Sequence, residues 1–421
     1  MFGFGNRFDR TDKLVLLLGF LVTVKVRIVG MFSVAELILM FILFIHNCSS
    51  YKHNKYVRRL HVFAITWLLG TIISNYYNNI DQIDFIKGTF FLIVLLLIIP
   101  PVYELLYEKP ERLVLFYLGY GFGQLLAPYT TTENDLSGSL LADVYIFYAV
   151  MFFISGIAYY LYLKGMRNFG LYLRYGIAVV GLFNMARNPF LMGSIAFLLL
   201  LLIKNDSDYD VETARSVFQR KIPRYFLIAF FALFIADSIY EPLAANGTLG
   251  KDAQKKYFKQ KLSGGNVLEG GRRETFMGIQ LIKENPIWGY GSYAKDRKNT
   301  FHRRYAAEHK IEYKSKGTKD ILLPSHSHIV GAWMQNGILG GVFWIYVLWM
   351  CWKVFKSGCI MCEPRMLCLL MFQSCSFLWD ICFSPFGDRT LTMFFLITLF
   401  IIYDRTMKGD YQNELVQKLD V

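Results

Sequence analysis

The sequence predicts an all-α polytopic integral membrane protein with about twelve transmembrane helices and one large loop subdomain on the outer side. Hydrophobic residues make up 54% of the 421 residues and charged residues only 18%, against roughly 25% in a typical globular domain. The apolar residues form continuous blocks, such as 90–99, 144–162 and 331–352, rather than the alternation of a barrel strand. Since about 20 apolar residues of helix cross the hydrocarbon and satisfy every backbone group, these blocks predict spanning helices.

Twelve apolar blocks predict the spans in chain order. Lys25 and Arg27 interrupt the first block, and merging it with the second would leave eleven helices. Residues 1–12 are polar and basic, and no small-residue cleavage site follows, so we expect the first helix to be retained. The predicted spans are 14–27, 28–46, 61–77, 88–107, 113–128, 141–163, 170–186, 189–203, 225–240, 329–352, 366–384 and 390–404.

The distribution of basic residues predicts that both termini are cytoplasmic. With the N-terminus inside, 23 of the 45 Lys and Arg residues fall in cytoplasmic segments and five in short outer loops, as the positive-inside rule requires. The other 17 lie in one long outer segment, 241–325. The chain thus divides into transmembrane helices at 1–240, a loop subdomain at 241–327, and the last helices with a cytoplasmic tail at 328–421.

The net charge of +13 would suggest a nucleic-acid partner in a soluble chain. Here membrane topology explains the basic residues better, and we expect no nucleic-acid binding. The outer segment nevertheless holds 17 basic residues against nine acidic ones. This excess indicates either a solvated surface that faces lipid headgroups or an anionic substrate held at the outer membrane face.

Two histidines lie where the outer segment enters a membrane helix. His326 is suited to taking a proton from a hydroxyl group near neutral pH. His326 and His328 could instead cap this helix, and zinc binding by the pair alone lacks carboxylate or cysteine partners. Cys359 and Cys362 also lack a second pair at zinc spacing, so we predict no metal site. Three glycines further along predict close packing against a neighbouring helix: Gly337, Gly340 and Gly341.

Arginine side chains are candidates for binding a phosphate or pyrophosphate. Arg272 and Arg273 follow two glycines at the start of a predicted helix, and a guanidinium group can bind such an anion with two parallel hydrogen bonds. Arg187 lies in a polar turn, where it could instead extend to the membrane interface. Ionisable residues inside a membrane are usually functional or paired. Three such residues add charge at the outer face around the last two predicted helices, namely Asp380, Asp388 and Arg389.

The string His326-Ser327, nine residues, Gly337-Ile-Leu-Gly340 resembles the His-[Asn/Ser/Gln]-x9-Gly-x-x-Gly pattern of the bacterial O-antigen ligase family. That family has about twelve helices with cytoplasmic termini and one large periplasmic segment directly before the motif. Its Gly-x-Arg helix ending in Lys-x-x-Pro is similar to residues 270–286. Its remaining charged positions resemble Arg187, Asp380 and Arg389. The likeness covers most of the C-terminal half, and the N-terminal half is similar only in hydropathy.

The resemblance implies an enzyme. Because the sequence has no nucleotide fingerprint or phosphate loop, and no D-x-D pair at the outer face, we expect it to need no cofactor, metal or ATP. It would transfer a glycan from undecaprenyl pyrophosphate to a sugar hydroxyl of lipid A–core at the periplasmic face of the inner membrane, with inversion. His326 would be the catalytic base. The donor pyrophosphate would be bound by Arg187, Arg389 and either Arg272 or Arg273, because the family's arginine usually lies one residue further from the proline than Arg272 does. The secondary candidates are His328, Asp380 and Asp388.

Two other functions remain open at this point. O-antigen and capsule polymerases share the architecture and arginine-rich outer loops, and their acceptor is a second undecaprenyl-linked repeat. A polysaccharide flippase or transporter is the more distant alternative. A transporter predicts ionisable residues spread through the spans near the midplane, whereas here they crowd one face and one long loop.

Overall fold

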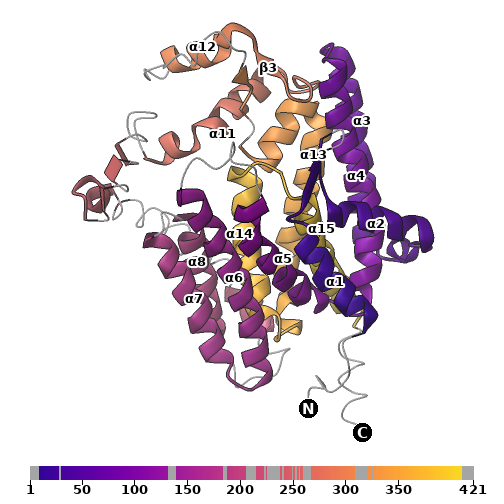
Figure 1. The fold of residues 1–421 in the computed structure, drawn as a ribbon, viewed down its shortest axis with the longest axis vertical. Helices are drawn as coiled ribbons and strands as arrows, with labels where there is room; N and C mark the ends of the chain where they lie inside the picture. The colour runs from indigo at the N-terminus through magenta and orange to yellow at the C-terminus, as the bar shows by residue number, and fades with distance from the viewer. Residues whose placement is uncertain are drawn as a thin grey trace.

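The computed structural model is almost entirely helical, which confirms the predicted all-α class (Figure 1). It describes residues 9–27, 30–130, 139–183, 187–204, 215–221, 224, 238, 241–248, 250–251, 254–255, 257–258, 267–308, 321–324 and 326–409. The helices of the bundle are α1 (Arg10–Leu21), α2 (Val34–Ile45), α3 (Lys55–Tyr77), α4 (Gln82–Tyr107), α5 (Arg112–Thr130), α6 (Ser139–Leu163), α7 (Arg167–Phe183), α8 (Arg187–Lys204), α13 (His328–Ser357), α14 (Leu367–Phe383) and α15 (Arg389–Lys408).

Among the described residues, four helices are long and apolar enough to cross a membrane: α3, α4, α13 and α15. Shorter apolar helices accompany them, namely α2, α14 and parts of α6 and α8. This supports the prediction of a membrane protein. The total of about twelve spans stays a prediction, and the predicted span 225–240 lies, apart from Ser238, outside the described residues.

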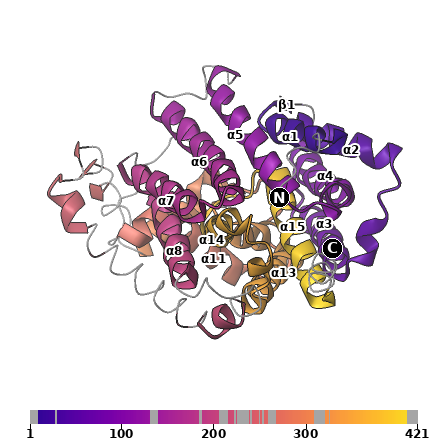
Figure 2. The same cartoon turned by 90° about the horizontal axis from the view of Figure 1, so that it is seen from below.

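The last three helices form the centre of the bundle. Figure 2 shows α13, α14 and α15 between a group that contains α1 to α4 and a group that contains α6 to α8. Within this arrangement α13 packs on α3, α15 packs on α4, and α14 packs on α8. Large side chains of these helices, such as Trp344 on α13 and Phe395 on α15, are almost fully buried. The C-terminal part of the chain therefore joins the two groups into one core.

The structure corrects the first two predicted spans, 14–27 and 28–46. Instead of two long helices, α1 and α2 contain 12 residues each, which is about 18 Å of helix and shorter than the roughly 30 Å of hydrocarbon. Antiparallel strands β1 (Lys25–Arg27) and β2 (Met31–Ser33) join them. A capping box formed by Ser33 and Glu36 begins α2, because a serine three residues before a glutamate satisfies free amides at a helix start.

A buried arginine lies inside the α6–α7–α14 contact. Arg174 on α7 is 5% exposed; its Nε donates a hydrogen bond to Ser155 Oγ at 3.1 Å, and its guanidinium lies 4.6 Å from the centre of the Phe372 ring. Arg174 was counted among the 23 cytoplasmic basic residues, although it lies within the predicted span 170–186. Its place in the core shows that not every basic residue in the topology count belongs to a loop.

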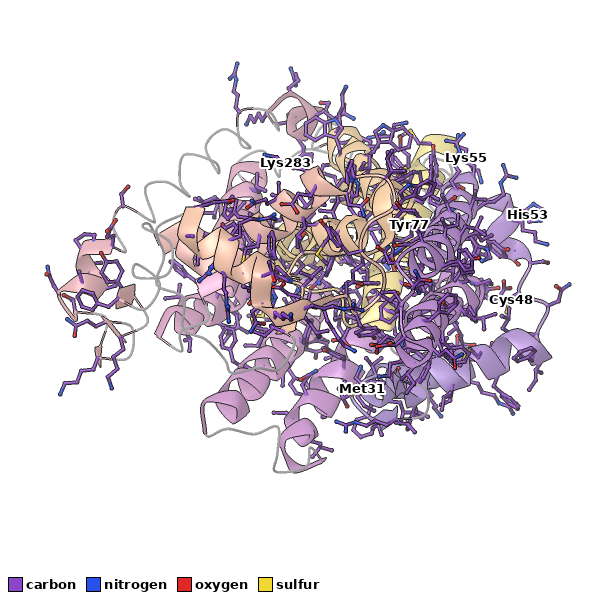
Figure 3. The ribbon with its side chains drawn as sticks, turned by 90° about the horizontal axis from the view of Figure 1, so that it is seen from above. Met31, Cys48, His53, Lys55, Tyr77 and Lys283 are labelled. Carbon is purple, nitrogen blue, oxygen red and sulfur yellow. The ribbon has the colours of Figure 1, made fainter. Side chains whose placement is uncertain are left out.

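The outer segment forms a separate layer at one end of the bundle. It contains α11 (Val267–Glu284), α12 (Thr300–Glu308) and the short strands β3 (Lys295–Asp296) and β4 (Ile321–Leu322). In Figure 1 this layer lies at the end opposite the start of α1 and the end of α15. Figure 3 looks onto it and labels Lys283 on α11 and Tyr77 at the end of α3.

Candidate active site

The junction between the outer segment and α13 is attached to two helices. Ser327 caps α13: its Oγ accepts a hydrogen bond from Val330 N at 3.1 Å and donates one to Ile381 O on α14 at 2.9 Å. From α11, Thr275 Oγ1 donates to His326 O at 2.9 Å. These bonds bring side chains of α11, α13 and α14 to one place.

His326 forms an ion-pair contact with Glu274 of α11 through its Nδ1 atom. The two side chains are 56% and 51% exposed, so a substrate can reach them. The hydrogen bond with Glu274 raises the pKa of His326 above its ordinary value, although partial burial and the positive charge of Arg272 act in the opposite direction. The result is a histidine with a carboxylate partner at Nδ1 and a second ring nitrogen, Nε2, that has no hydrogen-bond partner among the described residues.

Arg272 approaches the same place from the start of α11. Its backbone departs from helical geometry (φ −127°, ψ 19°). Its guanidinium lies 4.6 Å from the centre of the Trp379 ring and donates from Nη1 to Phe383 O at 3.1 Å. Burial lowers the pKa of Arg272, and the nearby carboxylate of Asp380 raises it. Arg272 therefore brings a positive charge near His326, and the acid that acts on this arginine is Asp380 of α14.

Arg273 points away from this site. Its guanidinium lies 5.7 Å from the centre of the Tyr305 ring on α12, whereas Arg272 contacts α14. Consecutive side chains on a helix diverge by about 100°, so only one of the pair can face His326. The sequence left this choice open, and the geometry selects Arg272.

His328 is in a different environment from His326. It is the first residue of α13 and only 6% exposed. Its ring centre lies 4.7 Å from that of Trp344 and 5.2 Å from that of Phe386. Because aromatic side chains of the bundle enclose it, His328 fills the core below the junction and does not join the cluster around His326.

Arg389 does not have the free guanidinium that binding a pyrophosphate requires, which contradicts its predicted role. It is 3% exposed. Its guanidinium binds both carboxylate oxygens of Glu36: Nε donates to Oε1 and Nη2 to Oε2, each at 2.9 Å. Nη1 and Nη2 also donate to the carbonyl oxygens of Phe91 at 3.0 Å and Met31 at 3.2 Å. Arg389 thus attaches the β1–β2 pair and α2 to α4 and α15. Sequence analysis overlooked Glu36 because it lies inside an apolar block.

The other predicted site residues divide between the two regions. Asp380 lies near Arg272 and accepts a hydrogen bond from Ser384 Oγ at 2.7 Å. Asp388 instead binds Lys25 Nζ at 2.9 Å and belongs to the strand-pair contact. Helix α8 begins at Arg187, but this side chain lies outside what the structure describes.

The glycine motif has a role that its spacing did not reveal. Gly337 interrupts α13 with φ 67° and ψ −164°, a backbone conformation that is essentially restricted to glycine. A Cβ atom there would lie 1.9 Å from Ile287 O. Gly337 therefore allows close contact with the loop that follows α11 through a break in the helix, whereas the glycine spacing predicted packing against a neighbouring helix.

The loop at 287–291 pairs with the broken turn of α13. Tyr290 N donates to Met334 O at 2.9 Å, Gly291 N to Gln335 O at 2.8 Å, and Ile338 N to Ile287 O at 3.2 Å. These bonds satisfy carbonyl and amide groups that the break leaves without helical partners. The end of α11 is thereby attached to the same helix that begins with the histidine junction.

Comparison with known proteins gave no match: no protein-family model and no curated protein sequence matches the chain. The site must therefore be interpreted from its own residues. Among the described residues, no group of three or more His, Cys, Asp or Glu side chains could hold a metal ion.

The arrangement combines a base with a cation. His326, with Glu274 at Nδ1, can accept a proton at Nε2. Arg272 can stabilise negative charge that develops close by. Sequence analysis counted Glu274 only among the acids of the outer segment; its one signal was its position directly after Arg272 and Arg273.

Proposed function

We propose that this protein is a membrane glycosyltransferase of the O-antigen ligase type. It transfers a glycan from undecaprenyl pyrophosphate to a sugar hydroxyl of lipid A–core. The observation that carries the proposal is the cluster of His326, Glu274 and Arg272 at the end of the bundle opposite the start of α1 and the end of α15. The identity of donor and acceptor comes from the resemblance of the His326–Gly340 motif to that family.

The location of the cluster supports a reaction at the periplasmic face of the inner membrane. The positive-inside distribution favours cytoplasmic termini, and the cluster lies at the other end. Tyr77 and Trp288 stack at this end with ring centres 5.6 Å apart, and both are exposed. Amphipathic aromatic rings are enriched at the membrane–water interface, so a lipid-linked donor and a lipid-linked acceptor can both approach the site within the outer leaflet.

The chemistry follows from the charges. His326 removes the proton of the acceptor hydroxyl, and the hydroxyl oxygen attacks the anomeric carbon of the donor with inversion. As the bond to the diphosphate breaks, Arg272 stabilises the charge of the leaving group, and Arg187 is assigned the same task by the resemblance. Such electrostatic stabilisation often contributes the largest share of catalysis. The energy is already stored in the donor linkage, so the proposal requires no ATP.

Deletion of the gene in its native bacterium tests this function. A ligase deletion leaves polymerised glycan on undecaprenyl pyrophosphate and unmodified lipid A–core. Single repeats on the lipid carrier would instead identify a polymerase, and unchanged glycolipids would exclude both. A direct assay uses protein reconstituted in lipid vesicles with purified donor and lipid A–core, in the presence of EDTA and without ATP. We expect transfer under these conditions.

A further inference from the structure

We propose that Glu274 is the positioning residue of His326. It accepts the Nδ1–H hydrogen of the imidazole and so leaves Nε2 as the nitrogen that takes the proton from the acceptor hydroxyl. This inference rests on the proposed function, because the hydroxyl is the acceptor of that reaction. The resemblance assigned no role to Glu274.

The geometry supports this role through two adjacent residues of α11. Glu274 contacts the imidazole ring, and Thr275 donates a hydrogen bond to the main-chain oxygen of the same histidine at 2.9 Å. Thr275 is 4% exposed, so the backbone contact is in the core while the ring contact faces solvent. One turn of α11 therefore holds both the position of His326 and the orientation of its ring.

The surrounding charges make Glu274 the dominant partner. Among the described residues, the charged groups that act on His326 are Glu274 and Arg272, both on α11. On α14, Asp380 acts on Arg272. From α13, His328 is enclosed by aromatic rings. Within the described part of the chain, Glu274 is thus the only negative group that contacts the imidazole, and it stabilises the imidazolium formed when the proton arrives.

The proton and electron balance of the step is complete. The acceptor O–H bond breaks, and its proton passes to His326 Nε2. The oxygen forms a bond to the anomeric carbon while the bond from that carbon to the diphosphate breaks, and the electron pair remains on the diphosphate beside Arg272. Imidazolium and Glu274 carboxylate then form an ion pair, and the proton returns to water before the next turnover.

The first test measures the pKa of His326 in the absence of substrate. In full-length protein in detergent micelles, the His326 ring is titrated by NMR and assigned by its loss in His326→Gln. Removing the negative charge in Glu274→Gln should lower the pKa of His326, because the present contact raises it. Glu284→Gln is the matched control, since this exposed glutamate lies on the same helix and pairs with Arg304; it should leave the titration unchanged.

The second test measures kcat/KM for glycan transfer as a function of pH. Only neutral imidazole can accept the proton, so kcat/KM rises with pH through the pKa of His326. Glu274→Gln should move this rise to lower pH. It should also reduce kcat/KM on the alkaline plateau roughly tenfold or more, but by no more than the about 10²–10⁴-fold loss expected when the base itself is removed. Thermal unfolding of each variant shows that it is folded.

The outcomes separate the inference from the function on which it rests. An unchanged His326 titration in Glu274→Gln would overturn the contact, whatever the activity. A lowered pKa with an unshifted pH profile and a normal plateau would remove Glu274 from the reaction while leaving the proposed transferase intact. If wild-type protein transfers nothing, both fail as catalysis, and the titration still reports whether Glu274 and His326 are paired.

Discussion

At the scale of single residues, the two histidines of the junction differ in surroundings rather than in chemistry. His326 is 56% exposed and has a carboxylate partner, whereas His328 is 6% exposed among aromatic rings. A proton acceptor must be reachable by the hydroxyl that it deprotonates. Within the proposed function, this difference favours His326 as the base and leaves His328 as a packing residue.

Replacing His326 by alanine should abolish glycan transfer in cells. Loss of a general base typically lowers the rate about 10²–10⁴-fold. Donor binding should persist, since a neutral imidazole adds little to the binding of a diphosphate. His328→Ala should instead lower the melting temperature in detergent while the folded fraction keeps its turnover. The measurement is donor affinity and turnover in reconstituted vesicles; an inactive but stable His328→Ala together with a fully active His326→Ala would reverse the assignment.

The two neighbouring arginines provide a matched pair of variants. Arg272→Ala should weaken donor binding as well as turnover, because this side chain lies beside His326 and Asp380. Arg272→Lys should restore activity only in part, since lysine keeps the charge but not the two-pronged geometry. Arg273→Ala should leave donor affinity close to wild type because its guanidinium faces Tyr305. Equal donor affinities for the two alanine variants would contradict the geometry.

The Arg389–Glu36 pair should behave as a structural ion pair. Removing one partner of a buried pair typically costs about 3–5 kcal/mol, because the other charge stays buried without compensation. Arg389→Ala and Glu36→Ala should each lower the free energy of unfolding by about this amount. The double variant should cost clearly less than the two combined. Chemical unfolding in detergent measures the cycle, and strictly additive effects would show that the pair is not coupled.

At the scale of elements, the break in α13 connects the end of α11 to the helix that carries the junction. A continuous helix would have no room for the loop at 287–291, whose amides bind carbonyl oxygens near Gly337. The glycine motif thus determines how the outer layer packs on the bundle. Helix α11 is then connected to α13 at two points, at its C-terminal end through this loop and at its middle through Thr275 and His326.

Gly337→Ala should destabilise the packing of the outer layer on the bundle. A residue forced into such a conformation costs about 1–3 kcal/mol, and the added Cβ would also meet Ile287 O at 1.9 Å. We expect a lower melting temperature and faster proteolysis of the outer segment. Gly176→Ala is the control, because nothing lies within 4 Å of a Cβ at that exposed position of α7. Similar losses in both variants would show that the break carries no special contact.

At the scale of the whole molecule, charge distribution and architecture define two ends. The start of α1 and the end of α15 lie at one end and the outer layer at the other (Figure 1). His53 lies in the turn before α3, at the end where Ser50 binds Glu104 near the end of α4, and it points outward in Figure 3. Lys295 of the outer layer binds Asp84 near the start of α4. If the predicted topology holds, the two ends of α4 lie on opposite sides of the membrane.

Thiol labelling tests this topology. In a background without the seven native cysteines, Lys283→Cys should react with a membrane-impermeant reagent added to intact spheroplasts. His53→Cys should react only after lysis. Both positions are exposed, so accessibility reports sidedness rather than burial. The opposite labelling pattern would invert the topology and place the proposed site in the cytoplasm.

The sequence by itself determined the class of the protein. Apolar content is a local property, and α3, α4, α13 and α15 follow from continuous blocks that must be helical in lipid. His326 was predicted as a candidate base from local sequence as well, because its position at the entry to α13 depends only on neighbouring residues. Local signals also placed Arg272 and Arg273 near the start of α11.

Only the tertiary structure decided which side chains meet. Hydropathy could not show that Arg389 binds Glu36 across the bundle, or that this contact accompanies a strand pair in place of long first helices. The choice of Arg272 over Arg273 depends on the rotation of α11 against α14, and the contact between Glu274 and His326 joins residues on different elements. The physical reason is that helix formation in lipid depends on local composition, whereas ion pairs and helix rotations depend on packing between distant segments.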